Sequence, residues 1–189
     1  MPGLRLFVAV DLGERVRRNL ELLQEELRPL ARDARWVPPE KAHLTLVFLG
    51  SMEESAVPGL VEALRSAAAP AAPFELQVQG GGAFGSRQRP RVLWAGVEGD
   101  TAALLALQRR TSEALVPLGY QPEEREYRPH LTLARARDPR GDRDLRRCAE
   151  SLAGRSLGAA RIDRAILFRS QLQRGGARYT PVAEEALAG

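Results

Sequence analysis

The chain contains two histidines, His43 and His130, and each begins the same four-residue motif, His-Leu-Thr-Leu. With 28 leucines and 5 threonines in 189 residues, Leu-Thr-Leu would follow a given histidine by chance about once in 1,700 cases. Composition therefore does not account for the repetition. Imidazole groups exchange protons near neutral pH, and threonine hydroxyl groups can hydrogen-bond phosphate oxygens. The motif pair thus points to acid–base chemistry on a phosphate ester.

The sequence around both motifs is apolar and typical of β-strands. Because side chains alternate between the two faces of a strand, His43 and Thr45 are expected on one face, with Phe48 and the leucines on the other. His130 and Thr132 are expected to share a face in the same way. A single His-x-Thr on a strand is usually structural, but two copies that include every histidine favour function. If the strands lie side by side, two imidazoles and two hydroxyls form one pocket.

The paired motifs resemble those that give the 2H phosphoesterases their name, two His-x-Thr/Ser-x sequences. Within that superfamily the chain is similar to the bacterial and archaeal RNA 2',3'-cyclic phosphodiesterases, historically called 2'-5' RNA ligases. The resemblance extends along the chain, through residues 5–10, 43–50, 128–135 and 178–181. The paired motifs are its specific part, and no motif position departs from the family pattern.

The residues alone favour hydrolysis of a strained cyclic phosphodiester, which needs a base, an acid and donors for the phosphoryl oxygens. The resemblance implies a 2',3'-cyclic phosphate at an RNA end or on a nucleotide, opened to a 2'-phosphate. It also implies that His43 is the proton donor and His130 the proton acceptor, while Thr45 and Thr132 bind the phosphate. With two histidines, one cysteine and no clustered acidic motif, we expect neither a metal ion nor another cofactor.

Arginines flank the second motif and are candidate substrate ligands. Arg125 and Arg128 precede the motif, and Arg135 follows it. Guanidinium groups bind phosphate bidentately, so Arg128 and Arg135 are predicted to contact the phosphate or the RNA end. Strict alternation points Arg135 away from His130, so this arginine reaches the pocket only if the strand ends or bulges there.

Aromatic side chains near the motifs are candidates for stacking a terminal base. Phe48 and Trp36 are nearest in sequence to a motif, and Phe48 is predicted to bind substrate. Such rings are more often part of a core, which is the alternative for Phe48, Trp36 and Trp94. Tyr179 is interpreted as a structural residue.

The order of predicted elements repeats along the chain. Helices are predicted from apolar residues at helical spacing, and strands from alternation or short apolar runs. The predicted strands are 5–12, 43–50, 74–78, 92–97, 130–135, 160–168 and 178–183, and the predicted helices are 14–31, 53–68, 101–116 and 142–153. Leu4 lies 39 residues before His43, and Val92 lies 38 residues before His130. This layout predicts one domain with an internal duplication, its halves at about residues 1–80 and 90–189.

Periodicity alone leaves the sheet topology open, because the helices between strands are long enough for parallel crossovers. The resemblance implies an α+β fold with two pseudo-twofold-related lobes of mostly antiparallel sheet and outer helices around a central cleft. The glycine-rich segment 80–86 lacks the spacing of a P-loop and is predicted to be a crossover loop. Arg87, Arg89 and Arg91, which follow this segment, are candidate phosphate contacts.

Hydrophobic residues make up 44% of the chain and charged residues 28%, as in ordinary soluble globular proteins. The single cysteine, Cys148, excludes an internal disulfide and indicates a reducing compartment; we interpret it as a packing residue. Without a signal-peptide pattern or a membrane-length apolar run, we expect a cytoplasmic monomer that does not bind membranes. The net charge of +4 permits nucleic-acid binding without requiring it.

Three other functions stay open from the sequence. The same acid and base would serve 2'-5' joining of RNA ends, the reverse direction. A non-catalytic RNA- or nucleotide-binding module would carry a similar groove, although intact histidines and threonines argue against a decayed site. The third is hydrolysis of another small cyclic phosphate, such as one derived from ADP-ribose. The arginine-rich stretch 135–147 is interpreted as a solvated loop and helix, with an RNA-contacting surface as the alternative.

Overall fold

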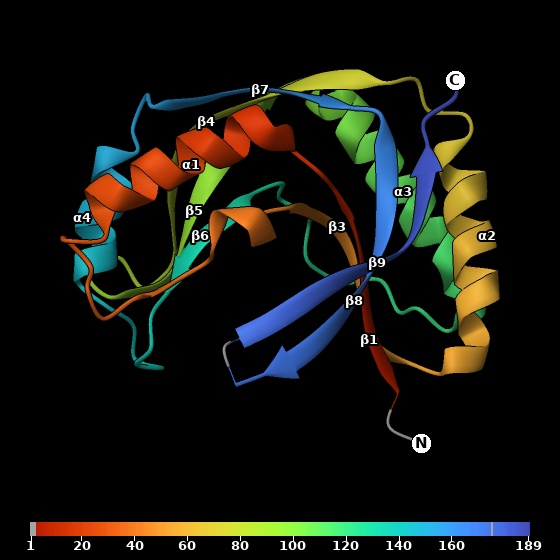
Figure 1. Ribbon diagram of the computed structural model, residues 1–189, viewed down its shortest axis with the longest axis horizontal. Helices are drawn as coiled ribbons and strands as arrows, with labels where there is room; N and C mark the ends of the chain where they lie inside the picture. Colours follow the sequence, from red (N-terminus) through yellow and green to blue (C-terminus); the bar gives the residue numbers. More distant parts are fainter. Residues whose placement is uncertain (1–2, 175) are drawn as a thin grey trace.

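Two antiparallel β-sheets form the centre of the fold (Figure 1). The computed structural model describes residues 3–174 and 176–189. In spatial order, the first sheet contains β3 (Leu44–Met52), β1 (Leu4–Val10), β8 (Arg164–Gln173) and β9 (Gly176–Ala186). The second contains β2 (Arg35–Trp36), β6 (Leu131–Arg135), β5 (Pro90–Gly99), β4 (Phe74–Gly85) and β7 (Ser156–Ile162). Every strand pair is antiparallel, which confirms the predicted α+β class with antiparallel sheets.

Helices cover the outer faces of the two sheets. They are α1 (Gly13–Leu27), α2 (Val57–Ala68), α3 (Thr101–Leu115) and α4 (Asp144–Ser151), with short 3-10 helices at 39–41, 54–56 and 116–118. α1 and α4 pack on the second sheet, while α2 and α3 pack on each other and on the first. Figure 1 shows the two helix pairs on opposite sides of the molecule, with the sheets between them. Each sheet therefore keeps one face free of helices.

The two sheets exchange strands between the halves of the chain. β4, from the first half, lies in the second sheet, whereas β8 and β9, from the second half, complete the first sheet. β1 lies between β3 and β8 in the same way that β5 lies between β6 and β4. The internal duplication within one bilobal domain stays a prediction. The exchange also means that the lobes do not coincide with the halves of the sequence.

The predicted helix at 14–31 is correct in type but shorter than expected. Its buried residues, Val16, Leu20, Leu23 and Leu27, follow the helical spacing that predicts an amphipathic helix. The helix ends at Leu27 because Pro29 has no backbone N–H with which to continue the hydrogen-bond pattern. The chain then turns toward β2.

Two predictions about single segments are wrong. The glycine run at 80–86 is part of β4 up to Gly85 and is not a crossover loop. A Cβ atom on Gly82 would lie 2.8 Å from Cζ2 of Trp94, so glycine allows the indole to lie against the strand. The predicted strand at 160–168 is divided at Asp163 into β7 and β8, which belong to different sheets.

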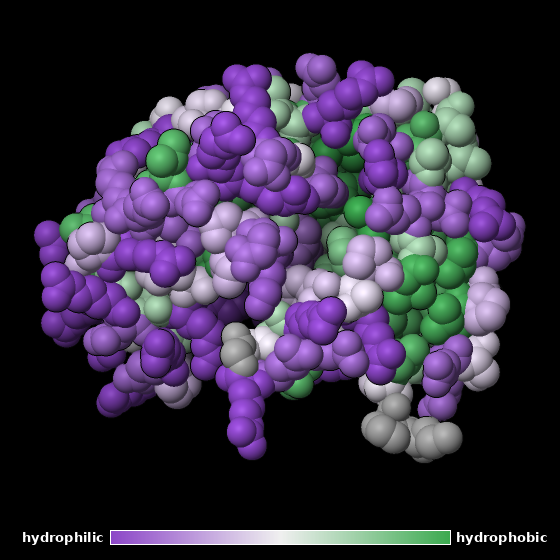
Figure 2. Space-filling view, in the orientation of Figure 1, coloured by the Kyte–Doolittle hydropathy of each residue, from purple (hydrophilic) through white to green (hydrophobic). Residues whose placement is uncertain are grey.

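Buried leucines from both sheets and all four helices form one connected core. Cys148 lies fully inside it, in agreement with its interpretation as a packing residue, and burial raises the pKa of its thiol to about 11. Figure 2 shows hydrophilic side chains over most of the lobe that carries α1 and α4. Among the helices that the structure describes, none is both long and apolar enough to cross a lipid bilayer.

Candidate active site

Both histidines are held by the same hydrogen bond. Nδ1 of His43 lies 2.8 Å from the carbonyl oxygen of Lys41, and Nδ1 of His130 lies 2.7 Å from that of Arg128. Because a carbonyl oxygen can only accept, each Nδ1 must be protonated and donate. Nε2 is therefore the exchangeable position of each ring, an acceptor when the imidazole is neutral and a donor when it is charged.

The leucines of each motif anchor its histidine and threonine, as predicted. All four motif leucines, Leu44, Leu46, Leu131 and Leu133, are buried. Each histidine stands one residue before its strand, β3 or β6, at a point where the chain leaves a proline-containing segment. The two histidines and the two threonines are partly exposed. The core thus holds the backbone of each motif while its polar side chains remain accessible.

His43 is enclosed by aromatic rings. Its ring stacks on Phe7 with centroids 4.7 Å apart, and it meets Tyr179 edge to face with centroids 5.1 Å apart. Phe168 is at 6.2 Å. Burial lowers the pKa of His43, an effect that the hydrogen bond to Lys41 and the charge of Asp11 partly oppose. Tyr179, interpreted from sequence as structural, therefore helps to form the surroundings of a candidate catalytic group.

His130 has a more open environment with one close aromatic contact. The ring of Phe84 meets it edge to face, with centroids 4.9 Å apart. Phe84 in turn stacks on Trp94 at 5.2 Å. Trp94 is half-buried beside the proposed site, so the interpretation of Trp94 as a core residue is wrong. Its indole Nε1 is buried without a hydrogen-bond partner among the described residues.

A β-bulge brings Phe48 to the same face as Thr45. Thr45 pairs with Ala9, but the next register pair skips Leu46, after which Phe48 pairs with Phe7. Paired residues in antiparallel strands share a face, so Phe48 lies on the same face as Thr45, whereas strict alternation predicts the opposite face. Its side chain is 46% exposed, and the guanidinium carbon of Arg5 lies 5.6 Å from its ring centroid. The prediction of the opposite face for Phe48 is wrong because the extra residue reverses the alternation.

The same bulge occurs at the equivalent position of β6. Thr132 pairs with Trp94, Leu133 is skipped, and Arg135 pairs with Val92. Arg135 therefore shares a face with Thr132, which meets the condition under which the sequence allows it to reach the pocket. Arg135 and Phe48 occupy corresponding places, each three residues after its threonine.

One hydrogen bond joins the two motif regions. The hydroxyl of Tyr127, three residues before His130, donates to the carbonyl oxygen of Thr45 at 2.8 Å. Burial raises the pKa of the Tyr127 hydroxyl, so it remains a neutral donor at ordinary pH. The segment that leads to the second histidine is thereby tied to the strand of the first.

A cavity of about 1010 Å³ lies between β3, α3 and the segment 120–130. It brings together four of the predicted site residues, Thr45, Phe48, Arg128 and His130, and Arg125 also lines it. The predicted residues His43, Thr132 and Arg135 do not line the cavity. His43 and Thr132 each lie two residues from a lining residue, Thr45 or His130, and Arg135 shares the strand face of Thr132. The cavity can therefore hold a nucleotide-sized group against one histidine and one threonine.

The arginines after the glycine run have different roles. Arg91 lines the cavity, and its contact with phosphate stays a prediction. Arg89 instead donates to the carbonyl oxygen of Gly141 and lies 3.7 Å from a carboxylate oxygen of Asp138, so it has a structural role. Within residues 3–174 and 176–189, no group of three or more His, Cys, Asp and Glu side chains is placed to hold a metal ion.

The sequence does not reveal the aromatic residues around the histidines. Phe7, Phe84 and Phe168 come from β1, β4 and β8, which are distant in sequence from the motifs that they contact. By register, Phe168 pairs with Phe7 and Phe84 pairs with Val92, so Phe168 and Phe84 occupy corresponding positions in the two sheets. Only the strand pairing gives this information, since aromatic residues in strands are usually core.

The sequence and the fold of this chain match those of known proteins. The family described as LigT like Phosphoesterase matches residues 10–94 and 96–179. An RNA 2',3'-cyclic phosphodiesterase of Methanothermobacter thermautotrophicus is 34% identical over 93% of this chain and 95% of its own length. The crystal structure of TT0787 of Thermus thermophilus matches with a TM-score of 0.83 and 30% identity over 98% of both chains. That of E. coli LigT complexed with 3'-AMP matches with a TM-score of 0.79 and 25% identity over 100% of both.

Proposed function

The chain belongs to the LigT-like phosphoesterase family, and on this premise we propose that it opens 2',3'-cyclic phosphodiesters at RNA ends or on nucleotides to 2'-phosphates. One observation carries the proposal. Two histidines at equivalent positions of the two sheets each donate through Nδ1 to a backbone carbonyl, which leaves both Nε2 atoms for proton transfer. Hydrolysis of a phosphodiester requires two such groups, a base and an acid.

In the proposed reaction, the neutral His130 takes a proton from a water molecule through Nε2. The water oxygen attacks phosphorus, the bond from phosphorus to the 3' oxygen breaks, and protonated His43 donates its Nε2 proton to that oxygen. The products are a 2'-phosphate and a 3'-hydroxyl, and the histidines return to their starting states by exchange with solvent. Each partner contributes about 10²–10⁴-fold to the rate. This route uses no metal ion and no cofactor.

The remaining predicted residues are assigned to substrate binding. Thr45 and Thr132 hydrogen-bond the non-bridging phosphate oxygens, because each shares a strand face with its histidine. Arg135 and Arg128 supply positive charge to the phosphate or to the RNA end. Phe48, exposed on the face of Thr45, stacks the terminal base.

The lowered pKa of His43 places a condition on its role as the acid. In the free protein, burial favours the neutral ring, which cannot donate from Nε2. A bound phosphodiester carries a negative charge, and an opposite charge nearby favours the protonated imidazole. We therefore assign the protonation of His43 to the substrate complex, where the acid is needed.

The decisive test is product analysis on a 2',3'-cyclic nucleotide in excess EDTA, with wild type beside His43→Ala and His130→Ala. Wild type is expected to form the 2'-phosphate, and each variant is expected to lose about 10²–10⁴-fold in kcat. Added imidazole should restore part of the activity of the variants. Glu21→Ala, at an exposed position of α1, is the control, and matching thermal unfolding curves exclude loss of the fold.

Each failure of this test has a defined meaning. Full activity in either histidine variant contradicts the two-histidine mechanism. Loss of wild-type activity in EDTA contradicts metal independence and indicates a metal-dependent enzyme. Tight binding of the cyclic nucleotide without turnover favours the non-catalytic binding module, and a 2'-5'-linked product from RNA with a free 5'-hydroxyl favours end joining.

A further inference from the structure

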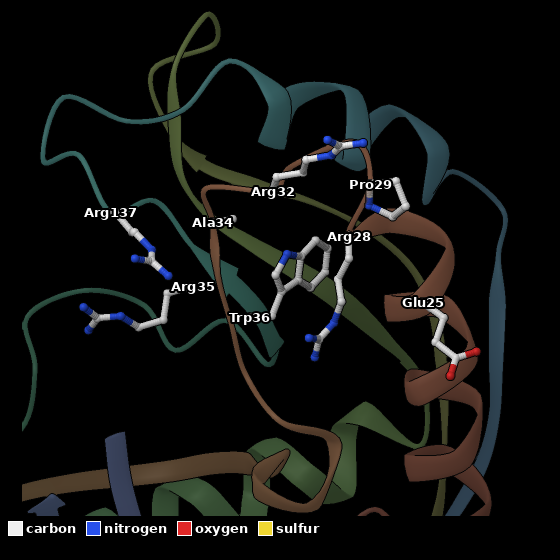
Figure 3. A pocket seen from close by; sticks show the side chains of 8 residues that line it. All are labelled: Glu25, Arg28, Pro29, Arg32, Ala34, Arg35, Trp36 and Arg137. Carbon is white, nitrogen blue, oxygen red and sulfur yellow. The ribbon is translucent and has the colours of Figure 1, made fainter. Parts of the chain in front are cut away.

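A second cavity, of about 740 Å³, lies outside the candidate active site, where α1 ends beside β2 (Figure 3). Its lining includes Trp36 and four arginines, Arg28, Arg32, Arg35 and Arg137. We call it the arginine pocket. In Figure 3 the guanidinium groups are distributed around the indole of Trp36, and they come from the segment after α1, from β2 and from the chain after β6.

The arginine pocket concentrates positive charge that the protein itself does not neutralise. Within the described residues, none of its four arginines forms an ion pair, although arginines elsewhere on the surface pair with carboxylates. Arg28 donates to the neutral side chain of Gln24 at 3.0 Å. Glu25 is the acidic residue of the lining, and Figure 3 shows its carboxylate directed away from the arginines. Four like charges around one cavity repel one another, so an anion bound among them is favoured.

Trp36 gives the arginine pocket a fixed aromatic surface. Its Nε1 donates to the carbonyl oxygen of Ala31 at 3.1 Å, which satisfies the indole donor and fixes the orientation of the ring. The side chain is half-buried, packed against the core on one side and lining the pocket on the other. A fixed ring surrounded by guanidinium groups is the arrangement that binds single-stranded nucleic acid, because bases stack while cations contact the phosphates.

The arginine pocket is continuous with the strand of the second motif. β2 pairs with β6 so that Arg35 lies opposite Arg135 and therefore on the same face. Arg137 follows Arg135 by two residues, a chain length that spans at most about 7 Å. Arg35 and Arg137, which both line the arginine pocket, thus lie next to the proposed phosphate ligand Arg135.

From this continuity we infer that the arginine pocket binds the nucleotides that precede the cyclic phosphate of a single-stranded RNA. The inference rests on the proposed function and narrows its substrate class. The terminal nucleotide occupies the active site, the preceding phosphates lie along Arg135 and Arg35, and one upstream base stacks on Trp36. The protein should therefore act on RNA ends better than on free cyclic nucleotides.

The test compares two substrates that share the same terminal nucleotide, a 2',3'-cyclic mononucleotide and a tetranucleotide ending in a 2',3'-cyclic phosphate. The variant is Arg32→Gln/Arg137→Gln, which spares Arg35 beside the site. Its kcat/KM is expected to fall about tenfold or more on the tetranucleotide, because charge-assisted contacts are lost. On the mononucleotide it should stay within about twofold, which corresponds to less than 1 kcal/mol.

Arg18→Gln/Arg161→Gln is the matched control, because it removes the same charge from exposed positions on α1 and β7. The control should leave both substrates unaffected. The dependence of tetranucleotide binding on salt gives a second readout. Each phosphate contact to a single strand contributes about 0.7 to the slope of log affinity against log salt, so the pocket variant should be shallower by about 1.4.

Equal losses on both substrates, or an unchanged tetranucleotide rate, would overturn the inference. If the wild-type protein hydrolyses neither substrate, the proposed function is wrong. RNA binding by the arginine pocket is then measured by fluorescence anisotropy with the labelled tetranucleotide. Weaker binding by the pocket variant than by the control then supports the inference, and equal binding overturns it. Trp36→Leu should also weaken binding while Trp36→Phe retains it. Equal binding by both would contradict the stacked base.

Discussion

At the scale of single residues, the two histidines share a hydrogen bond but differ in their surroundings. Each Nδ1 donates to a backbone carbonyl two residues earlier in the chain. His43 packs against Phe7 and Tyr179, whereas His130 meets the edge of Phe84. Burial lowers the pKa of His43 and favours its neutral form in the free protein. Two copies of one motif thus produce two chemically distinct imidazoles, which suits a reaction that needs one acid and one base.

Tyr179→Ala is expected to move the pH maximum of kcat/KM upward. In the proposed mechanism the maximum lies midway between the two apparent pKa values of the histidine pair. Burial lowers the pKa of His43, so opening its ring to water raises that pKa toward the ordinary value and raises the maximum with it. The measurement is kcat/KM on a 2',3'-cyclic nucleotide from about pH 5 to pH 9. Thr180→Ala, at the exposed neighbouring position, is the control, and an unchanged maximum in the tyrosine variant would refute the burial explanation.

At the scale of elements, a β-bulge at the equivalent point of each motif strand lets the strand pack in the core and also present side chains toward the proposed site. Leu46 in β3 and Leu133 in β6 are the extra residues, and both are buried. Each strand therefore buries consecutive apolar residues and still returns its next polar or aromatic side chain, Phe48 or Arg135, to the face of its threonine. β4 contributes in a different way, because its glycines leave room for Trp94 beneath Phe84.

Gly81→Ala is expected to lower the free energy of unfolding by about 1–3 kcal/mol, the range for overpacking a dense interior. A Cβ atom at Gly81 would overlap the carbonyl oxygen of Trp94 and lie 2.7 Å from Cδ1 of Leu152. The control is Gly59→Ala in α2, where the new Cβ would meet Leu118 at 3.4 Å and helix propensity favours alanine. Urea unfolding measures both. A Gly81 variant as stable as the Gly59 variant would contradict the close packing of β4 on β5.

At the scale of the whole molecule, the proposed site draws its residues from both sheets. His43 directly precedes β3 of the first sheet, which contains Thr45, and His130 directly precedes β6 of the second sheet, which contains Thr132. Strands exchanged between the halves of the chain hold the sheets in one core, and Tyr127 links the two motif regions directly. The packing of the entire fold therefore sets the distance between the two imidazoles.

Tyr127→Phe is expected to lower the free energy of unfolding by about 0.5–1.5 kcal/mol, because it removes the hydroxyl that donates to Thr45 and keeps the packed ring. The kcat should also fall, since the two motifs lose a direct connection. Tyr120→Phe, another tyrosine that lines the same cavity, is the matched control. Urea unfolding and single-turnover rates on a cyclic nucleotide measure the two effects. A variant with wild-type values in both would show that the hydrogen bond does not position the motifs.

The amino-acid sequence by itself determined the paired motifs, the catalytic candidates and the repeated order of elements. These features depend on residue types and short spacings, which the sequence contains directly. The leucines of the motifs are buried as predicted because a strand that begins with alternating apolar residues has one stable way to face a core. The α+β class followed from the family resemblance carried by those motifs, and the antiparallel pairing confirms it.

Only the tertiary structure decided which face Phe48 and Arg135 occupy, since each depends on a bulge that appears when two strands pair. It also decided that Tyr179 contacts His43 and that Trp36 lies among arginines from three separate segments. Strand register and the exchange of strands between sheets bring residues together from distant parts of the chain. Local alternation carries no information about those partners, because the free energy that selects them is that of packing the entire core.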